Sequence, residues 1–350
     1  MVKSRSFIAT PPGATIKEQL LDRGLSQKEF AVRMGMSEKH ISKLINGEVQ
    51  LTPDVAVRLE MVLGIHAKFW NKLEATYREK IVKANAENDM DADKELAKKL
   101  PYREMSKNGW VPETRDITEK VIHLRKYFEV VKLEIIKNMQ LSKIACRRLA
   151  ETEKSDLALL AWAQKAKLEA RSIDTLLVDL KTLKKSLPEI RSMTTMNPSD
   201  FCPKLIELLS NCGIALVFLP HIGGSFLHGA TFYDGNKIVV GLTVRGKDVD
   251  KFWFSLFHEL GHILLGHINQ PNGTTEEDEK AADNFAKEIL IPTEEFNAFT
   301  AQNDFSKAAI CAFAQEEHIL CGVIVGRLQK EGFINYNCCN DLKTKYELTA

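Results

Sequence analysis

The sequence predicts a multidomain protein with an all-α domain at its N-terminal end, a helical middle region and an α+β domain at its C-terminal end. Its length of 350 residues is sufficient for two or three domains. Short helical patterns fill residues 14–80 of a first domain that we place at residues 1–80, and Lys, Glu, Ala and Leu dominate residues 81–195. Short apolar, β-branched runs then appear between helical patterns, which indicates strands. We therefore predict a third domain over residues 196–350.

Composition restricts the classes of partner and compartment. The formal net charge of +1 does not favour nucleic acid or membrane surfaces through an overall field. No apolar run reaches the ~18 residues of a membrane span, and the opening MVKSRSFIATPPG lacks the apolar core of a signal peptide. The seven cysteines form no CxxC pattern, which fits a reducing compartment. We expect a cytoplasmic protein that does not contact a membrane.

The run WFSLFHELGHILLGH, residues 253–267, places titratable groups on an otherwise apolar helix. It contains the HExxH motif His258-Glu259-Leu260-Gly261-His262. Residues four apart share one face of a helix, so His258 and His262 can direct two imidazoles at one zinc ion. Glu259 can reach a metal-bound water and act as general base, and zinc lowers the pKa of that water to about 7. The motif predicts a catalytic zinc site with Glu259 as its catalytic residue.

A catalytic zinc also needs a third protein ligand. The downstream run EEDEKAADNFAKEILIP reads as a second helix. Glu279, seventeen residues after His262, is the predicted third ligand, and Glu277 is the alternative. Asp283, one turn further on, is predicted to accept a hydrogen bond from a ligand histidine and to orient it. We interpret His267 as a capping or surface residue, not as a ligand.

Two strands are predicted ahead of the motif, at GIALVFLP (213–220) and NKIVVGLTVRG (236–246). Residues 237–244 are either an edge strand that pairs with an extended peptide substrate or an ordinary core strand. A donor to the oxyanion of a tetrahedral intermediate is also expected from this region. The sequence offers three candidates without choosing among them: His221, His228 and Tyr233.

Residues 25–65 have the pattern of a helix-turn-helix. Ser26 is a predicted N-cap in a capping box with Glu29, Gly35 makes the turn, and Ser37 caps the second helix. The outward face of the second helix is polar and basic, as expected of a helix in a DNA major groove. The predicted DNA-contacting residues are Gln27, Ser37, Lys39, His40, Ser42 and Lys43. A small helical bundle used for protein contacts is the alternative.

Both ends resemble known families. Residues 14–80 resemble the HigA-type antitoxin branch of the Cro/repressor-like helix-turn-helix family, through LSQKEFAVRMGMSEKHISKLINGEVQLTPDVAVRLEMVLGIHAKFWNKLEATY. Residues 200–335 resemble the ImmA/IrrE family of zinc metallopeptidases, through FWFSLFHELGHILLGH, EKAADNFAKEILIP and GVIVGRLQKEGFINY. The second resemblance implies a zincin-like domain of the gluzincin type. One residue departs from the family pattern, because Ala281 stands where a second glutamate is common.

The resemblance implies a function and its parts. The family's zinc-binding histidines fall on His258 and His262, its catalytic glutamate on Glu259 and its downstream ligand on Glu279. Family members cleave repressors of the helix-turn-helix kind and so switch on stress or mobile-element genes. A DNA-binding regulatory protease is implied, with Zn²⁺ as cofactor and with DNA and a repressor-type protein as partners. The HigA-like part implies a toxin partner, and helix-turn-helix proteins usually bind DNA as homodimers.

Two other functions remain open from the sequence. In the first, the protein is a transcriptional repressor or antitoxin whose C-terminal domain is a non-catalytic sensor or interaction module. In the second, weaker one it is a housekeeping peptidase. Glu259 separates the first alternative from the protease, because a purely structural zinc site needs no carboxylate beside its first ligand.

Overall fold

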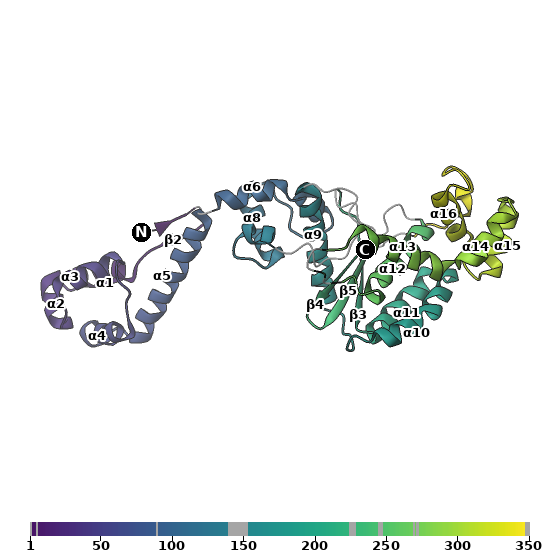
Figure 1. Cartoon of the computed structure of the whole chain (residues 1–350). Helices are drawn as coiled ribbons and strands as arrows, with labels where there is room; N and C mark the ends of the chain where they lie inside the picture. Colours follow the sequence, from purple (N-terminus) through teal and green to yellow (C-terminus); the bar gives the residue numbers. More distant parts are fainter. Residues whose placement is uncertain are drawn as a thin grey trace. The chain divides into compact units, whose positions relative to one another are not determined.

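A computed structural model of the chain describes most of its 350 residues, namely 2–4, 6–88, 90–138, 153–223, 229–243, 248–268, 270 and 273–346. The chain divides into two compact units, Met1–Lys94 and Glu95–Ala350. Figure 1 shows the elements of each unit. This division differs from the predicted boundaries, because residue 80 lies inside a helix that runs to Asn88 and because helices of the middle region pack into the C-terminal unit.

The N-terminal unit is a small helical domain preceded by a short antiparallel strand pair. The strands are β1 (Val2–Lys3) and β2 (Ile8–Ala9). The helices are α1 (Pro12–Asp22), α2 (Gln27–Met34), α3 (Glu38–Asn46), α4 (Pro53–Leu63) and α5 (Ala67–Asn88). One apolar side chain every third or fourth residue points inward, and Phe30, Ile41 and Trp70 are fully buried in the resulting core. Helix α6 (Asp91–Lys99) spans the division between the units.

The predicted helix-turn-helix caps are present with one difference. The Ser26 hydroxyl accepts a hydrogen bond from the Glu29 N–H, and the Ser37 hydroxyl accepts one from the His40 N–H, both at 3.2 Å. Gly35 turns the chain with a φ of 64°. The Glu29 carboxylate instead binds Arg33 at 2.7 Å, so the reciprocal half of the predicted capping box is not observed.

The C-terminal unit consists of many helices around a small mixed sheet. Its strands are β3 (Ile214–Leu219), β4 (Gly229–Asp234) and β5 (Lys237–Thr243). The strand order is β3-β5-β4, with β5 parallel to β3 and antiparallel to β4. Strand β5 is therefore central. Of the two alternatives left open for residues 237–244, the described residues 237–243 form the core strand and not the substrate-binding edge. The edge beside α12 is β4, which the sequence did not predict as a strand.

Helices cover both faces of this sheet. Those before the sheet are α7 (Tyr102–Lys107), α8 (Ile117–Phe128), α9 (Glu153–Ala170), α10 (Leu180–Ser192) and α11 (Pro198–Asn211), with short 3-10 turns at Leu133–Asn138 and Met193–Thr195. Helix α9 packs on β3 and β5 through Trp162, which lies against Gly241. On the face of the sheet opposite α9, alternate residues of β5 belong to the core, namely Ile238, Val240 and Leu242. A sheet buried on both faces explains why these strands read as continuous apolar runs.

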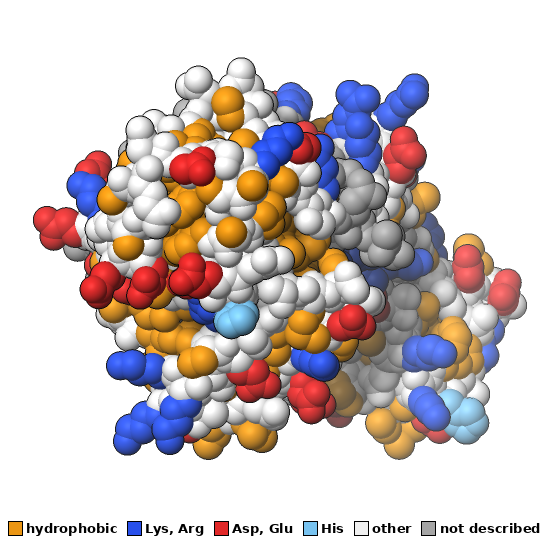
Figure 2. All heavy atoms as spheres, turned by 90° about the vertical axis from the view of Figure 1, so that its right-hand side faces the viewer, with side chains coloured by type: hydrophobic (Ala, Val, Ile, Leu, Met, Phe, Trp, Pro, Cys, Tyr) orange, Lys and Arg blue, Asp and Glu red, His pale blue; other side chains and the backbone are white. Residues whose placement is uncertain are grey.

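The helices after the sheet carry and surround the HExxH motif. They are α12 (Val249–Leu264), α13 (Glu276–Leu290), α14 (Thr293–Ala301), α15 (Lys307–Glu316) and α16 (Cys321–Glu331), followed by a 3-10 turn at Asn340–Leu342. Helix α12 is buried on nearly every side, between the sheet, α13 and α16. Figure 2 shows the face on the α14–α15 side, where hydrophobic side chains gather between charged ones.

In the described part of the chain, no single helix has both the length and the apolar composition to cross a membrane. Helices α15 and α16 meet that test only as a pair, and they are bent by 115° at their junction.

Candidate metal centre and nucleic-acid interface

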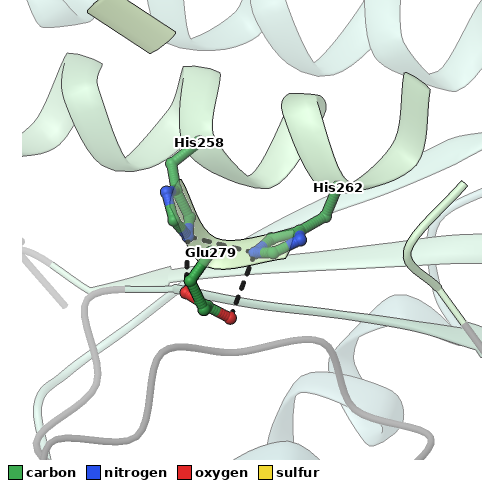
Figure 3. Close-up of side chains that lie close together, drawn as sticks. All are labelled: His258, His262 and Glu279. Atoms are coloured by element: carbon green, nitrogen blue, oxygen red, sulfur yellow. Dashed lines mark hydrogen bonds and ion pairs between the residues drawn. The ribbon is translucent and has the colours of Figure 1, made fainter. Parts of the chain in front are cut away.

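Three side chains from two helices converge on one point. His258 and His262 lie one turn apart on α12, and Glu279 reaches them from the first turn of α13 (Figure 3). The two Nε2 atoms are 3.0 Å apart. The Glu279 oxygens lie 3.3 Å from Nε2 of His258 and 3.5 Å from Nε2 of His262. The structure thus brings the three predicted ligands together.

The spacing of these atoms fits a zinc ion. Ligands about 2.1 Å from a common tetrahedral centre lie roughly 3.4 Å from one another. The three observed separations of 3.0, 3.3 and 3.5 Å are close to that value. Both Glu279 oxygens are shielded from solvent and face the two imidazoles. Two imidazoles and a carboxylate form the donor set of a catalytic zinc site.

The protonation of the two histidines is unequal. Burial disfavours protonation of His258, but hydrogen bonds to Asp283 and Glu279 outweigh it and raise its pKa to about 9. Burial and the neighbouring charge of His258 lower the pKa of His262 to about 4. Without a metal, His258 is therefore the protonated ring of the pair, and the carboxylates of Asp283 and Glu279 balance its charge. A metal cation that binds between the two Nε2 atoms and Glu279 displaces the His258 proton.

Asp283 lies where the sequence predicted, one turn after Glu279. Its Oδ1 is 2.9 Å from Nδ1 of His258, on the side of the ring that faces away from His262. A carboxylate at this position fixes the ring and leaves Nε2 available to a metal. Lys330 of α16 lies 3.5 Å from the second oxygen of Asp283 and so balances its charge.

Glu259 lies beside the ligand pair and is only 2% exposed. Its Oε2 accepts a 2.5 Å hydrogen bond from the hydroxyl of Thr231 on β4. Gly229, at the start of that strand, passes so close that an added Cβ would lie 2.7 Å from Oε1 of Glu259. Burial raises the pKa of Glu259 to about 7, although nearby His258 and the Thr231 hydrogen bond work in the opposite direction. A carboxyl with a pKa near neutrality is suited to general acid–base chemistry.

A cavity of about 630 Å³ opens beside these residues. His258, Glu259 and Gly229 form part of its wall, and the remainder comes from α12, α13, α16 and the segment that follows α16. Phe254, Leu290, Ile291 and Val323 supply apolar surface. Cavities of this size accommodate ligands of several residues or a drug-sized molecule.

Of the two roles that the sequence suggested for His267, capping or surface residue, the structure shows the first, because its backbone N–H donates to the carbonyl oxygen of His262 at the end of α12. His267 is 9% exposed, and its Nδ1 lies 3.1 Å from Nδ1 of His262. Its Nε2 lies 3.4 Å from Oδ1 of Asp278. The surface interpretation is wrong because Gly266, with a φ of 78°, turns the chain back under α12 as the helix ends. The side chain therefore folds against the ligand histidine.

The predicted DNA-contacting residues lie on α2 and α3. Lys39 and Lys43 are exposed on α3, and His40, Ser42 and Gln27 are partly buried. Ser37 is exposed, but its hydroxyl is occupied as the cap of α3. The buried residues Ile41 and Leu44 set the opposite face of α3 against the core. This leaves a basic outer face on the second helix of the pair.

Comparison with known proteins finds a family match for the helix-turn-helix region and another for the region that contains the HExxH motif. Residues 16–70 match the family model described as Helix-turn-helix, and residues 228–324 match that of peptidase family M78, described as the IrrE N-terminal-like domain. The uncharacterized HTH-type transcriptional regulator YddM of Escherichia coli (strain K12) is 35% identical over 63 residues, 18% of this chain and 67% of that protein. The chain belongs to the helix-turn-helix family.

This helix-turn-helix protein has a second similar relative. Virulence-associated protein A of Dichelobacter nodosus is 34% identical over 68 residues, which cover 19% of this chain and 67% of that protein. The chain is a DNA-binding regulator fused to an IrrE N-terminal-like domain, whose family consists typically of zinc metallopeptidases. The match spans the whole of α12, with the HExxH motif, and the whole of α13, with Glu279.

Several predicted residues do not join the candidate metal centre of this regulator. Glu277 is exposed on α13 and is not needed as a ligand, because Glu279 occupies that position. Tyr233 is 47% exposed on β4, and His221 lies just beyond β3; neither lines the cavity. His228 lies outside the described residues. No oxyanion donor is therefore assigned among the three candidates.

Sequence reasoning missed four residues that touch the site. Gly229 and Thr231 were missed because GATFYD was not recognised as a strand, although its Thr-Phe-Tyr run followed by Asp234-Gly235 is a strand-and-turn signal. Asp278 and the inward position of His267 were missed because the chain reverses between α12 and α13. A glycine directly before His267 was the available signal for that reversal.

Proposed function

We propose that this regulator is a zinc-dependent metallopeptidase that cleaves a repressor-type or partner protein and so controls transcription. The observation that carries the proposal is the position of Glu259. Its carboxylate is buried directly beside the convergent ligands and forms part of the cavity wall. A structural zinc site is closed by its ligands and has no role for such a group, whereas a hydrolytic site requires one.

The residues divide the chemistry among them. When bound by His258, His262 and Glu279, zinc supplies a Lewis acid that acidifies water and polarises a carbonyl group. Glu259 in its deprotonated form takes the proton from the attacking water and then delivers it to the leaving amine. Thr231 holds Glu259 in place through its hydroxyl. Burial raises the pKa of Glu259 above its ordinary value, which favours this carboxyl as the group that accepts and releases that proton.

The geometry of β4 supports a polypeptide substrate. Among the described residues, β4 pairs only with β5 and forms the edge of the sheet. Gly229 at its start lines the cavity, and Thr231 contacts Glu259. An extended peptide that adds to this edge by backbone hydrogen bonds runs past the general base. We therefore assign to β4 the substrate-binding role that the sequence suggested for residues 237–244.

In this proposal, the N-terminal unit binds DNA and so directs the protein to the genes that it regulates. We propose that α3 enters a DNA major groove, with Lys39 and Lys43 on phosphates and His40, Ser42, Ser37 and Gln27 near the groove. Homodimerisation follows from the two-fold symmetry with which such domains read DNA. Membership of the HigA-type antitoxin branch and a toxin partner rest on the sequence resemblance alone.

A cleavage assay with Glu259→Gln tests the peptidase. Wild type and variant are incubated with helix-turn-helix repressors of the same genome and with unrelated unfolded proteins, and the products are identified by mass spectrometry. We expect wild type to cut a repressor at a defined bond. Glu259→Gln should retain zinc but cleave at least about 100-fold more slowly, the scale of a lost general base.

The same assay separates the alternatives. If zinc-loaded wild type cuts no repressor, and Glu259→Gln regulates transcription as wild type does, the C-terminal unit is a non-catalytic sensor or interaction module. Cleavage of the unrelated unfolded proteins as readily as the repressors indicates a housekeeping peptidase instead.

A further inference from the structure

The polar contacts of His262 continue beyond the metal centre. On one side of the ring, Nε2 faces His258 and Glu279. On the other side, Nδ1 lies 3.1 Å from Nδ1 of His267, and Nε2 of His267 lies 3.4 Å from Oδ1 of Asp278. His262 is fully buried, and the side chains of His267 and Asp278 are 10% and 19% exposed. A shielded row of three side chains therefore links a ligand atom to a carboxylate.

Only one arrangement of protons lets Nε2 of His262 bind a metal and satisfies this row. A metal-binding Nε2 uses its lone pair, so the proton of a neutral His262 lies on Nδ1. This N–H donates to Nδ1 of His267, which must then carry its own proton on Nε2. That second N–H points at the Asp278 carboxylate, which can only accept. Asp278 thus selects the tautomer of His267, and His267 selects that of His262.

Local backbone structure holds the row in place. The His267 N–H donates to the carbonyl oxygen of His262 at 2.9 Å, directly after the turn at Gly266. The second oxygen of Asp278 accepts from the N–H of Thr275 at 2.8 Å and from its hydroxyl at 2.9 Å, which caps α13. The residue after Asp278 is the third ligand, Glu279. His267 therefore connects the α12 ligand to the helical turn that carries the α13 ligand.

We propose that His267 and Asp278 are positioning residues of the zinc site. His267 fixes the tautomer and ring orientation of His262, and Asp278 fixes His267 in turn. Each ligand histidine then has its own orienting chain, since Asp283 contacts Nδ1 of His258 directly. Loss of such a partner typically weakens metal binding by about 10–100-fold. This inference rests on the proposed zinc site, but not on peptidase activity.

Two substitutions at His267 separate positioning from packing. His267→Leu fills the space but removes both polar contacts. His267→Asn places an amide oxygen near the former Nδ1, so it can still accept the proton of His262 while losing Asp278. We expect zinc affinity, measured by competition with a chromophoric chelator, to fall in the order wild type, Asn, Leu, with the Leu variant about 10–100-fold weaker. His66→Asn, which removes an exposed imidazole of the N-terminal unit, is the matched control and should bind zinc as wild type does.

The absorption spectrum of the cobalt(II)-substituted protein reports the geometry of the metal site. Cobalt(II) replaces zinc in such sites, and its visible absorption depends on the orientation of the ligands. The spectra of both His267 variants should differ from that of wild type, whereas the spectrum of His66→Asn should not. Circular dichroism establishes that each variant is folded, and if His267→Leu is unfolded, His267→Asn decides.

The outcomes separate this inference from the proposed function. Wild type that binds one zinc, with folded His267 variants of unchanged affinity and unchanged cobalt spectrum, overturns the positioning role and leaves the zinc site intact. Wild type that binds no zinc overturns the proposed function and, with it, the inference.

Discussion

The hydroxyl of Thr231 on β4 donates a 2.5 Å hydrogen bond to the carboxylate of Glu259 on α12. Both side chains are buried, at 0% and 2% exposure. The bond opposes the effect of burial and lowers the pKa that Glu259 would otherwise reach. It also joins the edge strand β4 to the proposed general base. The proposed chemistry therefore depends on a strand as much as on the HExxH helix.

Thr231→Val removes this hydroxyl and retains the branched shape. The ionised form of Glu259 then loses a hydrogen bond of about 1.5–3 kcal/mol, so its pKa rises by about one or two units. We expect the acidic limb of the kcat/KM profile, where activity rises with pH, to move to higher pH by that amount, with a cleavage rate at neutral pH about 5- to 50-fold lower. Thr231→Ser retains a hydroxyl and should restore the profile. An unshifted profile in the Val variant, with zinc retained, contradicts the role of this bond.

The free energy of unfolding of the zinc-free protein should depend on pH because Glu259 is buried. Burial raises its pKa from the ordinary 4.5 to about 7. The protonated form therefore contributes stability below the lower value, and this contribution is lost as the pH rises through the upper one. Glutamine at this position does not titrate. In denaturant titrations, the free energy of unfolding of zinc-free Glu259→Gln should rise relative to that of zinc-free wild type as the pH increases from about 5 to about 8. A difference in unfolding free energy that stays constant across this range argues against a buried Glu259 carboxyl with a raised pKa.

The basic face of α3 should dominate DNA affinity. Lys39→Ala and Lys43→Ala each remove an exposed cation. Each should weaken binding to specific and non-specific DNA alike and reduce the slope of log affinity against log salt by about 1, as expected of one phosphate contact. Fluorescence anisotropy over a salt series measures both quantities. Lys72→Ala, an exposed cation on α5, is the control. Equal salt slopes in all three variants and wild type place the DNA surface elsewhere.

Local sequence signals predicted the parts of the site that lie on single helices. The i, i+4 spacing places His258 and His262 on one face of α12, and the ExxxD spacing places Glu279 and Asp283 on one face of α13. The caps at Ser26 and Ser37 follow from the same kind of short-range pattern. These features depend on a few neighbouring residues, so tertiary contacts did not alter them.

Contacts between elements that are distant in the sequence could not be predicted from such short-range patterns. Periodicity does not state which of two strands is central, so β5 was a candidate edge until its pairing with both β3 and β4 was seen. The Thr231–Glu259 bond depends on which strand lies beside α12, and the His267–Asp278 contact depends on how the chain turns between two helices. Trp162, from the predicted helical middle region, packs on the sheet because an apolar face needs cover.

Zinc content, measured by elemental analysis on protein purified without added metal, tests the central claim most directly. The comparison uses wild type, His262→Ala and Glu259→Gln. The account predicts about one zinc per chain in wild type and in Glu259→Gln, because Glu259 is not a ligand, and none in His262→Ala. Wild type without zinc, and with no uptake when zinc is added, would contradict the metal centre and leave a DNA-binding regulator with a C-terminal unit of another role.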